Sequence, residues 1–210
     1  MKREHMMQLS LNRVVIASSN TGKLAEIDRL LAPLGIRVVT QASLGVTEAD
    51  EPHMTFVENA LAKARHASLA TGLPALADDS GICVSALQGA PGVFSARFAG
   101  EPRSDERNNL KLIEALQGQS DRRAYYCCVI VLLRHAQDSR PVIIEDTWHG
   151  EIIARPAGQG GFGYDPYFFL PELGKTAAEL SVEEKNRISH RGKALARLVK
   201  LLVENEKALA

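Results

Sequence analysis

The first half of the chain alternates between short apolar runs and longer stretches with helical spacing. Residues 14–16 are continuously apolar and predict a β-strand, whereas apolar residues recur every three or four positions over residues 24–34 and predict a helix. The apolar run IRVV, after Gly35, predicts a second strand. Strand and helix signals therefore follow one another, as in an α/β protein.

A helix and a third strand are predicted next. Thr55 and Glu58 form a T-x-x-E capping box, which predicts a helix beginning at residue 56 and ending at Gly72. The run LPALA then predicts a buried strand that ends at DDSG and delivers two carboxylates at its carboxyl end, where open α/β sheets bind ligands. Because side chains alternate along a strand, only one of Asp78 and Asp79 is expected to face a cleft.

The second half of the chain predicts a loop, two strands and two helices. The glycine- and proline-rich segment GAPGVFSARFAGEP precedes a helix over residues 104–116, and AYYCCVIVLL and PVIIEDTWHGEII predict two antiparallel strands. A last helix is expected from about residue 181 to the C-terminus. The interleaved elements predict an α/β fold with a mixed sheet and flanking helices, with two lobes in one cooperative unit.

Composition restricts the classes of partner. The chain has 210 residues, of which 45% are hydrophobic, and its 25 basic residues balance 25 acidic ones. This balance predicts neither a nucleic-acid partner nor a membrane-surface partner. Residues 1–12 lack the apolar core of a signal peptide, so we expect a cytoplasmic protein with a flexible N-terminal extension. Cys83, Cys127 and Cys128 lack metal-ligand spacing and are expected to be buried thiols.

The segment SSNTGK, at the predicted junction of the first strand and helix, favours anion binding. Such a turn places free backbone N–H groups, the positive end of a helix dipole and Lys23 around one point, which suits a phosphate. The Walker pattern fails, because Ala17 replaces its first glycine and Leu24 follows the lysine where Ser or Thr is required. The alternative is an ordinary strand-to-helix connection with a surface lysine.

The segment GQGGFG spells G-x-G-x-x-G over residues 158–163. A dinucleotide fingerprint must begin a helix, but Pro166 follows closely and disfavours one, so NAD binding is rejected. Glycines beside Phe162 and Tyr164 indicate a backbone that approaches something flat, such as a purine. The alternative is a glycine-rich turn whose aromatic residues fill the core.

Acidic residues form two groups that could hold a metal ion. One group is Asp78 and Asp79, and the other is Glu51 with its neighbours Glu48 and Asp50. Carboxylates are the ligands that magnesium prefers when it also binds substrate phosphates. Solvated turn residues are the alternative.

The segment EEKNRISHRGKA contains Lys185, His190 and Arg191. The histidine and the arginine can donate to a purine carbonyl, and the arginine and the lysine can neutralise phosphate. On one straight helix Lys185 and His190 would diverge by about 140°. A shared site therefore needs a cleft that wraps the helix start or a bend in the helix, and a solvated helix face is the alternative.

Six ordered motifs make the chain resemble the inosine triphosphate pyrophosphatase family. They are SSNTGK, FVENALAKA, ADDSG, GAPGVFSARFAG, GGFGYDP and SHRGKAL, and the similarity extends over residues 14–202. The resemblance implies an elongated α/β fold, with two lobes around a central substrate cleft, in one domain over residues 13–210. It also implies a homodimer that uses Mg²⁺ and hydrolyses ITP, dITP and XTP to the monophosphate and pyrophosphate.

The resemblance also implies a role for each matched residue. Asp79 would be the catalytic base and, with Glu51 or an adjacent acid of the same group, a metal ligand. Lys63 would add a phosphate contact. The substrate would be bound by Ser18, Ser19, Asn20, Thr21, Gly22, Lys23, Ser80, Phe162, Gly163, Tyr164, Asp165, Lys185, His190 and Arg191.

Two other functions compete with this one. A pyrophosphatase for modified pyrimidine or methylated nucleotides could use a related scaffold. A non-catalytic nucleotide sensor or RNA-binding module would bind nucleotide without releasing pyrophosphate, although the balanced charge and the acidic ADDSG segment disfavour RNA.

Overall fold

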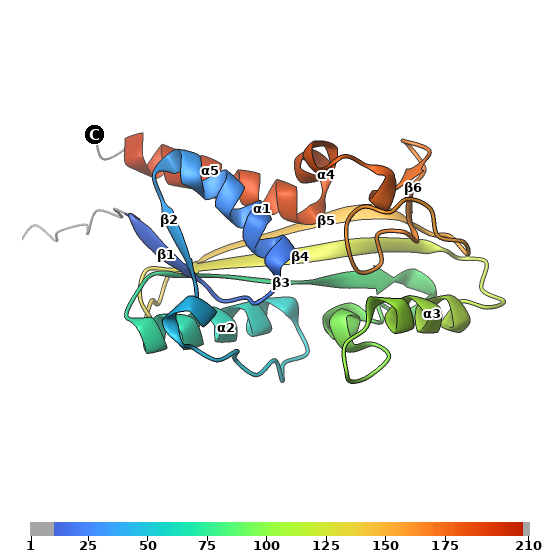
Figure 1. Cartoon of the computed structure of the whole chain (residues 1–210), viewed down its shortest axis with the longest axis horizontal. Helices are drawn as coiled ribbons and strands as arrows, with labels where there is room; N and C mark the ends of the chain where they lie inside the picture. The colour runs from blue at the N-terminus through green and yellow to red at the C-terminus, as the bar shows by residue number, and fades with distance from the viewer. Residues whose placement is uncertain (1–10, 208–210) are drawn as a thin grey trace, which may run out of the picture.

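A seven-stranded mixed sheet forms the centre of the computed structural model, which describes residues 11–207 (Figure 1). The strand order is β2-β1-β3-β4-β5-β6-β7. β1 pairs in parallel with β2 and β3, and all later pairs are antiparallel. The strands are β1 (Arg13–Ile16), β2 (Arg37–Thr40), β3 (Ala75–Val84), β4 (Arg123–Leu133), β5 (Val142–Ile152), β6 (Phe168–Leu170) and β7 (Lys175–Thr176). The predicted α/β class with a mixed sheet is confirmed.

Helices cover both faces of the sheet in an elongated molecule (Figure 1). On one face lie α1 (Thr21–Leu31), α4 (Val182–Ile188) and α5 (His190–Lys207). On the other lie α2 (Phe56–Thr71) and α3 (Asp105–Ala115). Short 3₁₀ helices are η1 (Ala32–Leu34), η2 (Ala42–Leu44), η3 (Ser85–Leu87), η4 (Gly92–Arg97) and η5 (Ala177–Glu179). No helix within residues 11–207 is both long and apolar enough to cross a membrane.

Local capping sets the helix boundaries. The Asn20 side chain accepts a hydrogen bond from the Lys23 N–H at 3.1 Å, so α1 begins three residues before the predicted start at residue 24. Thr55 caps α2 as its capping-box sequence predicts, and Gly72 ends that helix in the left-handed region at φ 68°. The starts of α1 and α2 are therefore each fixed by one polar side chain.

The prediction that the third strand ends at DDSG is wrong. β3 continues through this segment to Val84, because β4 pairs with it residue by residue and Asp78 lies opposite Ile130. Only the parallel pairing ends here, since β1 stops at Ile16, opposite Leu76. Beyond Leu76 one edge of β3 therefore lacks a neighbouring strand, and the two aspartates lie along this open edge.

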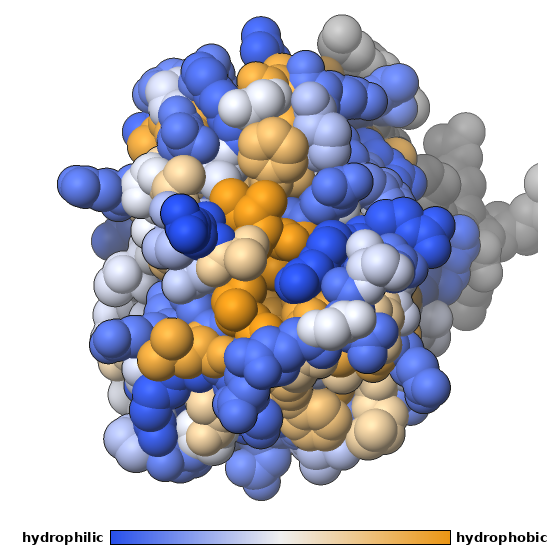
Figure 2. All heavy atoms as spheres, turned by 90° about the vertical axis from the view of Figure 1, so that its right-hand side faces the viewer, coloured by the Kyte–Doolittle hydropathy of each residue, from blue (hydrophilic) through white to orange (hydrophobic). Residues whose placement is uncertain are grey.

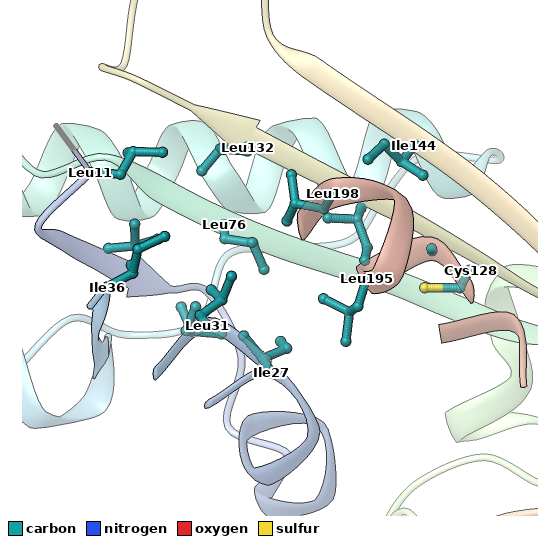
Figure 3. Packing of buried hydrophobic residues seen from close by; sticks show 14 residues of the cluster. Leu11, Ile27, Leu31, Ile36, Leu76, Cys128, Leu132, Ile144, Leu195 and Leu198 are labelled. Carbon is teal, nitrogen blue, oxygen red and sulfur yellow. The ribbon is translucent and has the colours of Figure 1, made fainter. Parts of the chain in front are cut away.

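The first of three apolar clusters fills the space between the sheet and the helices α1 and α5. In Figure 3, Ile27 and Leu31 of α1 and Leu195 of α5 lie around Leu76 of β3. A second cluster includes Leu112 of α3 and Phe168 of β6. It lies near the end of the molecule viewed in Figure 2, where hydrophobic residues form a band framed by hydrophilic ones.

A third cluster, on the opposite face, packs the alanines of α2 against β3 and β4. All three cysteines are free, and all are buried, as the sequence predicts.

The predicted flexible extension over residues 1–12 needs a correction at its end. Leu11 is buried in the first cluster, and the Asn12 carbonyl accepts a hydrogen bond from the Arg37 N–H at 3.0 Å. Residues 1–10 lie outside the described part of the chain. Residues 11 and 12 therefore belong to the packed structure, through the apolar cluster and the pairing with β2.

Candidate active site

One cavity of about 490 Å³ brings the predicted site residues together. All of them line it except Thr21 and Gly22, which occupy the first two positions of α1. The lining comes from the β1–α1 turn, the middle of β3, the loop before β6 and the α4–α5 junction. A volume of this size is typical of a small-molecule site. Lys23, Asp79 and Arg191, which are remote in the sequence, therefore lie around the same space.

Asp78 lines this cavity and contacts one residue near the beginning of the chain and one near its end. Its buried carboxylate forms ion pairs with Lys23 and with Arg191 Nε, the latter at 3.0 Å, and accepts a hydrogen bond from Cys128 Sγ at 2.9 Å. Burial alone would raise the pKa of Asp78, but Arg191 and Lys23 outweigh burial and hold that pKa well below its usual range. Asp78 is therefore an ionised structural hub.

Asp79 points to the opposite face of β3, toward α2. Lys63 Nζ lies 2.8 Å from Asp79 Oδ1 and 2.8 Å from Glu51 Oε1. Asp79 Oδ2 is buried without a hydrogen-bond partner. Burial raises the pKa of the Asp79 carboxyl, and Lys63 offsets only part of that effect. The expectation that only one of the two aspartates faces the cleft is wrong, because the cavity extends around the open edge of β3 and both line it.

Glu51 is held between two cations. Lys63 takes one carboxylate oxygen, and Arg97 NH1 donates to the other at 3.1 Å. Arg97 NH2 also donates to the Glu51 backbone carbonyl at 3.2 Å. Burial would raise the pKa of Glu51, but Lys63 and Arg97 together lower it. The three residues form an ionised cluster beside Asp79.

His190 is a neutral aromatic residue in the wall of the cavity. Its ring is stacked on Tyr126, with centroids 4.7 Å apart and planes inclined by 6°. Burial, reinforced by the neighbouring Arg191, lowers the pKa of His190 well below its usual value. His190 Nδ1 has no hydrogen-bond partner. The imidazole is therefore uncharged near neutral pH and has a ring nitrogen free for a ligand.

Arg191 is fixed on three sides. Besides Asp78, it donates from NH1 to Glu26 at 2.7 Å and from NH2 to Ser80 at 2.9 Å. Each terminal guanidinium nitrogen carries two hydrogens, so each keeps one N–H beyond these bonds. The guanidinium thus has a fixed orientation and spare donors beside His190.

A break between α4 and α5 allows Lys185 and His190 to share the cavity. Ser189 adopts extended angles of φ −70° and ψ 162° and separates the two helices. Gly192 makes this junction possible, because a Cβ atom there would overlap the carbonyl oxygen of Asn186. Of the two possibilities that the sequence leaves open, the structure shows the bend.

As predicted, the loop with the GQGGFG sequence does not begin a helix. Its glycines approach protein atoms: a Cβ at Gly158 or Gly160 would press on Ala178, and one at Gly161 would overlap the Asp165 carboxylate. The idea that these glycines face a flat ligand is therefore not needed to explain them. Phe162 remains at the cavity, with Lys185 Nζ lying 4.8 Å from its ring centroid.

The comparisons with known proteins agree on one family. The Ham1 family model matches residues 14–201. The chain belongs to the Ham1 family. A dITP/XTP pyrophosphatase from Nitrosomonas europaea is 87% identical over 196 residues, which are 93% of this chain and 97% of that protein. A dITP/XTP pyrophosphatase from Ralstonia nicotianae is 63% identical over 91% of this chain and 97% of its own length.

Solved structures of Ham1 proteins have the same fold. The HAM1 protein from Coxiella burnetii gives a TM-score of 0.87 at 49% identity, covering 91% of this chain and 98% of that one. The Staphylococcus aureus Ham1 protein gives 0.83 at 40% identity, again covering 91% of this chain and 98% of the other. The family predicted from the six motifs is thus confirmed, and the matched region of this Ham1 chain contains every predicted site residue.

Sequence reasoning missed several residues at the site of this Ham1 protein. Glu26 holds Arg191, and Arg97 holds Glu51. Asp105 lines the cavity beside Gly163. Arg97 lies inside the GAPGVFSARFAG motif, which was a usable signal although it indicated no partner. Glu26 lies three positions after Lys23 on α1, so helical spacing places the two near one another. Nothing in the local sequence marks Asp105.

Proposed function

We propose that the protein hydrolyses the non-standard purine nucleoside triphosphates ITP, dITP and XTP to the nucleoside monophosphate and pyrophosphate. The observation that carries this proposal is one cavity whose wall combines the cationic groups of Lys23 and Lys63, an acid with an unpartnered oxygen, and the His190–Arg191 pair. Membership of a family whose relatives are named dITP/XTP pyrophosphatases supports the substrate class. Hydrolysis would remove these nucleotides before they enter DNA or RNA.

The phosphate chain is assigned to the end of the cavity near the β1–α1 turn. Lys23 and Lys63 present ammonium groups there, and Ser18, Ser19 and Asn20 line the same wall. Both lysines are engaged by carboxylates, so these side chains are positioned before the substrate arrives. Fixed cations stabilise charge that develops on phosphate oxygens, which is the main protein contribution to phosphoryl transfer.

The residues at the centre fit a magnesium ion that also contacts substrate phosphate. No group of three His, Cys, Asp or Glu residues within the described part of the chain is arranged to hold a metal by itself. Magnesium commonly uses one or two carboxylates and completes its shell with water and phosphate. Asp79 supplies an unpartnered oxygen and Glu51 lies on the other side of Lys63, so these two acids are the proposed ligands. When bound, the ion would neutralise phosphate charge and polarise the phosphoryl group.

Asp79 is proposed as the general base. Its carboxylate takes a proton from a water molecule, which attacks the α-phosphorus and displaces pyrophosphate. Before a metal ion binds, burial raises the pKa of Asp79 and makes it a stronger base than an exposed aspartate. Lys63 is hydrogen-bonded to Oδ1, so Oδ2 has its lone pairs free for the metal and for the proton of the attacking water.

Selectivity is assigned to the edge of the purine. A 6-keto oxygen can accept hydrogen bonds from the spare N–H groups of Arg191. The 6-amino group of adenine would instead place its own N–H donors against these donors. A buried donor left unpaired costs about 1–3 kcal/mol, which corresponds to roughly 5- to 150-fold. His190, neutral and with one free ring nitrogen, can complement the same edge.

Hydrolysis of a substrate panel tests this proposal. Pyrophosphate release is measured with ITP, dITP, XTP, GTP, ATP and 5-methyl-UTP, with and without magnesium. The proposal expects the first three to be preferred and the reaction to need the metal. A preference for 5-methyl-UTP would favour the pyrimidine alternative, and tight binding without turnover would favour a sensor.

Assembly and location complete the proposal. The family resemblance supports a homodimer, for which light scattering after size exclusion would give twice the 22.9 kDa of one chain. A mass of one chain at micromolar concentration would contradict it. The substrate pool and the balanced charge support a cytoplasmic protein without a nucleic-acid partner.

A further inference from the structure

Both backbone polar groups of Gly163 are held by the helix α3. The Gly163 N–H donates to Asp105 Oδ2 at 2.7 Å, and Asn109 Nδ2 donates to the Gly163 carbonyl at 2.9 Å. These partners are 58 and 54 residues away in sequence. One residue of a glycine-rich loop is thus clamped by two side chains one helical turn apart.

The loop needs such support because of its own composition. Gly158, Gly161 and Gly163 all adopt positive φ angles, at 79°, 72° and 63°. Glycine loses more conformational freedom than any other residue when it is ordered, so a loop with several glycines is costly to hold in one shape. Contacts from a rigid neighbouring element reduce that freedom.

The buried side chain of Asn109 lowers the stability of the fold through one of its two polar atoms. Its Oδ1 atom is buried without any hydrogen-bond partner, while its Nδ2 reaches Gly163. An unsatisfied buried oxygen costs about 1–3 kcal/mol. The Asn109 amide therefore makes its contact with the loop through Nδ2, while its Oδ1 atom stays without a hydrogen bond.

The clamped residue lies between the side chains that face the cavity. Phe162 precedes it and lies near Gly22 of α1, where an added Cβ would come within 3.2 Å of the ring. Tyr164 follows and donates to the Ser95 carbonyl at 2.7 Å. Asp165 then forms an ion pair with Lys185 and accepts from the Phe162 N–H at 2.9 Å. A shift of Gly163 would move the proposed nucleoside contacts on both sides.

We propose that Asp105 and Asn109 are positioning residues that hold the loop over residues 158–165 in the shape that binds the nucleoside. This inference rests on the proposed function, and it adds a specific task for α3. Neither side chain needs to touch the reacting atoms. The clamp acts through Gly163, which sets the placement of Phe162 and Asp165.

The clamp predicts a change in substrate binding with little change in the chemical step. A hydrogen bond of this kind contributes about 0.5–1.5 kcal/mol, so Asp105→Ala should raise KM for ITP roughly three- to tenfold. The value of kcat at saturation should stay within about twofold, because Asp79 and Lys63 lie on other elements. Asp105→Asn keeps an acceptor oxygen and should restore most of the binding.

The first turn of α3 offers a matched control. Glu106 is the next residue, also acidic and also exposed, and it has no hydrogen bond to the loop. Glu106→Ala removes the same charge from the same helix end and therefore controls for effects on the helix dipole. Hydrogen exchange of a peptide covering residues 158–165 reports on the clamp directly, since the Gly163 amide is one of its protected groups.

The experiment combines that exchange with two binding readouts. These are KM for ITP and the affinity for inosine monophosphate, followed by fluorescence of Trp148, the single tryptophan of the chain, whose ring lies 6.3 Å from that of His190. The proposal expects faster exchange and weaker binding in Asp105→Ala, and neither in Glu106→Ala. Because exchange and monophosphate binding need no turnover, they still test the clamp if the wild type does not hydrolyse ITP.

Three results would overturn the inference. Equal effects of Asp105→Ala and Glu106→Ala would assign the change to the helix end. Weaker binding with unchanged exchange would mean that Asp105 contacts the nucleotide itself. Faster exchange with unchanged KM and unchanged monophosphate affinity would show that the shape of the loop does not matter for binding.

Discussion

Asp78 and Asp79 are neighbours in sequence but should respond oppositely to the same substitution. Asp78→Asn keeps the shape of the side chain and removes the charge that faces Lys23 and Arg191. Only 3% of the Arg191 side chain and 14% of the Lys23 side chain are exposed to solvent, so water cannot replace the lost carboxylate. We expect a large loss of stability.

The magnitude follows from burial. Removing one partner of a buried ion pair costs about 3–5 kcal/mol. Glu26 remains 2.7 Å from Arg191 and compensates part of its charge, so we expect the lower end, about 3 kcal/mol. For a chain of this size that loss lowers Tm by roughly 6–12 °C.

Asp79→Asn should leave the stability nearly unchanged and lower the turnover. Lys63 keeps its 2.8 Å contact with Glu51, and the substitution removes a carboxylate whose charged form burial already disfavours. We expect the free energy of unfolding to change by less than about 1 kcal/mol, within the range of ordinary substitutions. Loss of a general base should lower kcat by roughly 10²- to 10⁴-fold.

The assay is urea unfolding followed by Trp148 fluorescence, combined with pyrophosphate release from ITP for each variant. Calorimetry gives Tm as an independent measurement. The reasoning is refuted if Asp78→Asn unfolds within 0.5 kcal/mol of wild type, or if Asp79→Asn keeps wild-type turnover at saturating magnesium. Either result would mean that burial and ion pairing do not separate the two roles.

Three further predictions concern other parts of the chain. Gly192→Ala should destabilise the protein by about 1–3 kcal/mol in urea unfolding, because its Cβ would overlap the Asn186 carbonyl; a gain in stability, as for an unhindered helix position, would contradict the packing. Hydrogen bonds from Arg134 lower the pKa of Asp138. The ionised Asp138 carboxylate therefore stabilises the fold above pH ~4, and this stabilisation is lost as the pH falls. The free energy of unfolding of Asp138→Asn should therefore vary less between about pH 2 and 4, and an unchanged acid profile would argue against this. Glu51→Gln should raise the magnesium concentration for half-maximal activity roughly tenfold or more, whereas an effect of Asp50→Asn instead would shift the ligand assignment by one residue.

The parts of the fold that depend on local signals could be predicted from the sequence. The capping box of Thr55 and Glu58 set the start of α2, and the polar turn after residue 16 marked the junction of β1 and α1. The end of β3 could not be predicted, because Asp, Ser and Gly are typical strand terminators. Pairing with β4 over the full length of β3 overrides that preference.

The candidate site divides in the same way. The six motifs identified most of the predicted site residues that line the cavity, whereas Glu51 and Lys185 came from segments outside the motifs. The motifs did not identify Glu26, Arg97 or Asp105, whose tasks arise from contacts with Arg191, Glu51 and Gly163 in other parts of the chain. Such pairs become visible only when the sheet and the helices bring distant segments together.

The position of bond cleavage tests the central claim most directly. The wild-type enzyme hydrolyses ITP in water enriched in oxygen-18, and mass spectrometry locates the label in the products. Attack of an Asp79-activated water on the α-phosphorus predicts one labelled oxygen in inosine monophosphate and none in pyrophosphate. Label in pyrophosphate, or release of orthophosphate in its place, would contradict the arrangement of base, phosphate chain and purine described for this cavity.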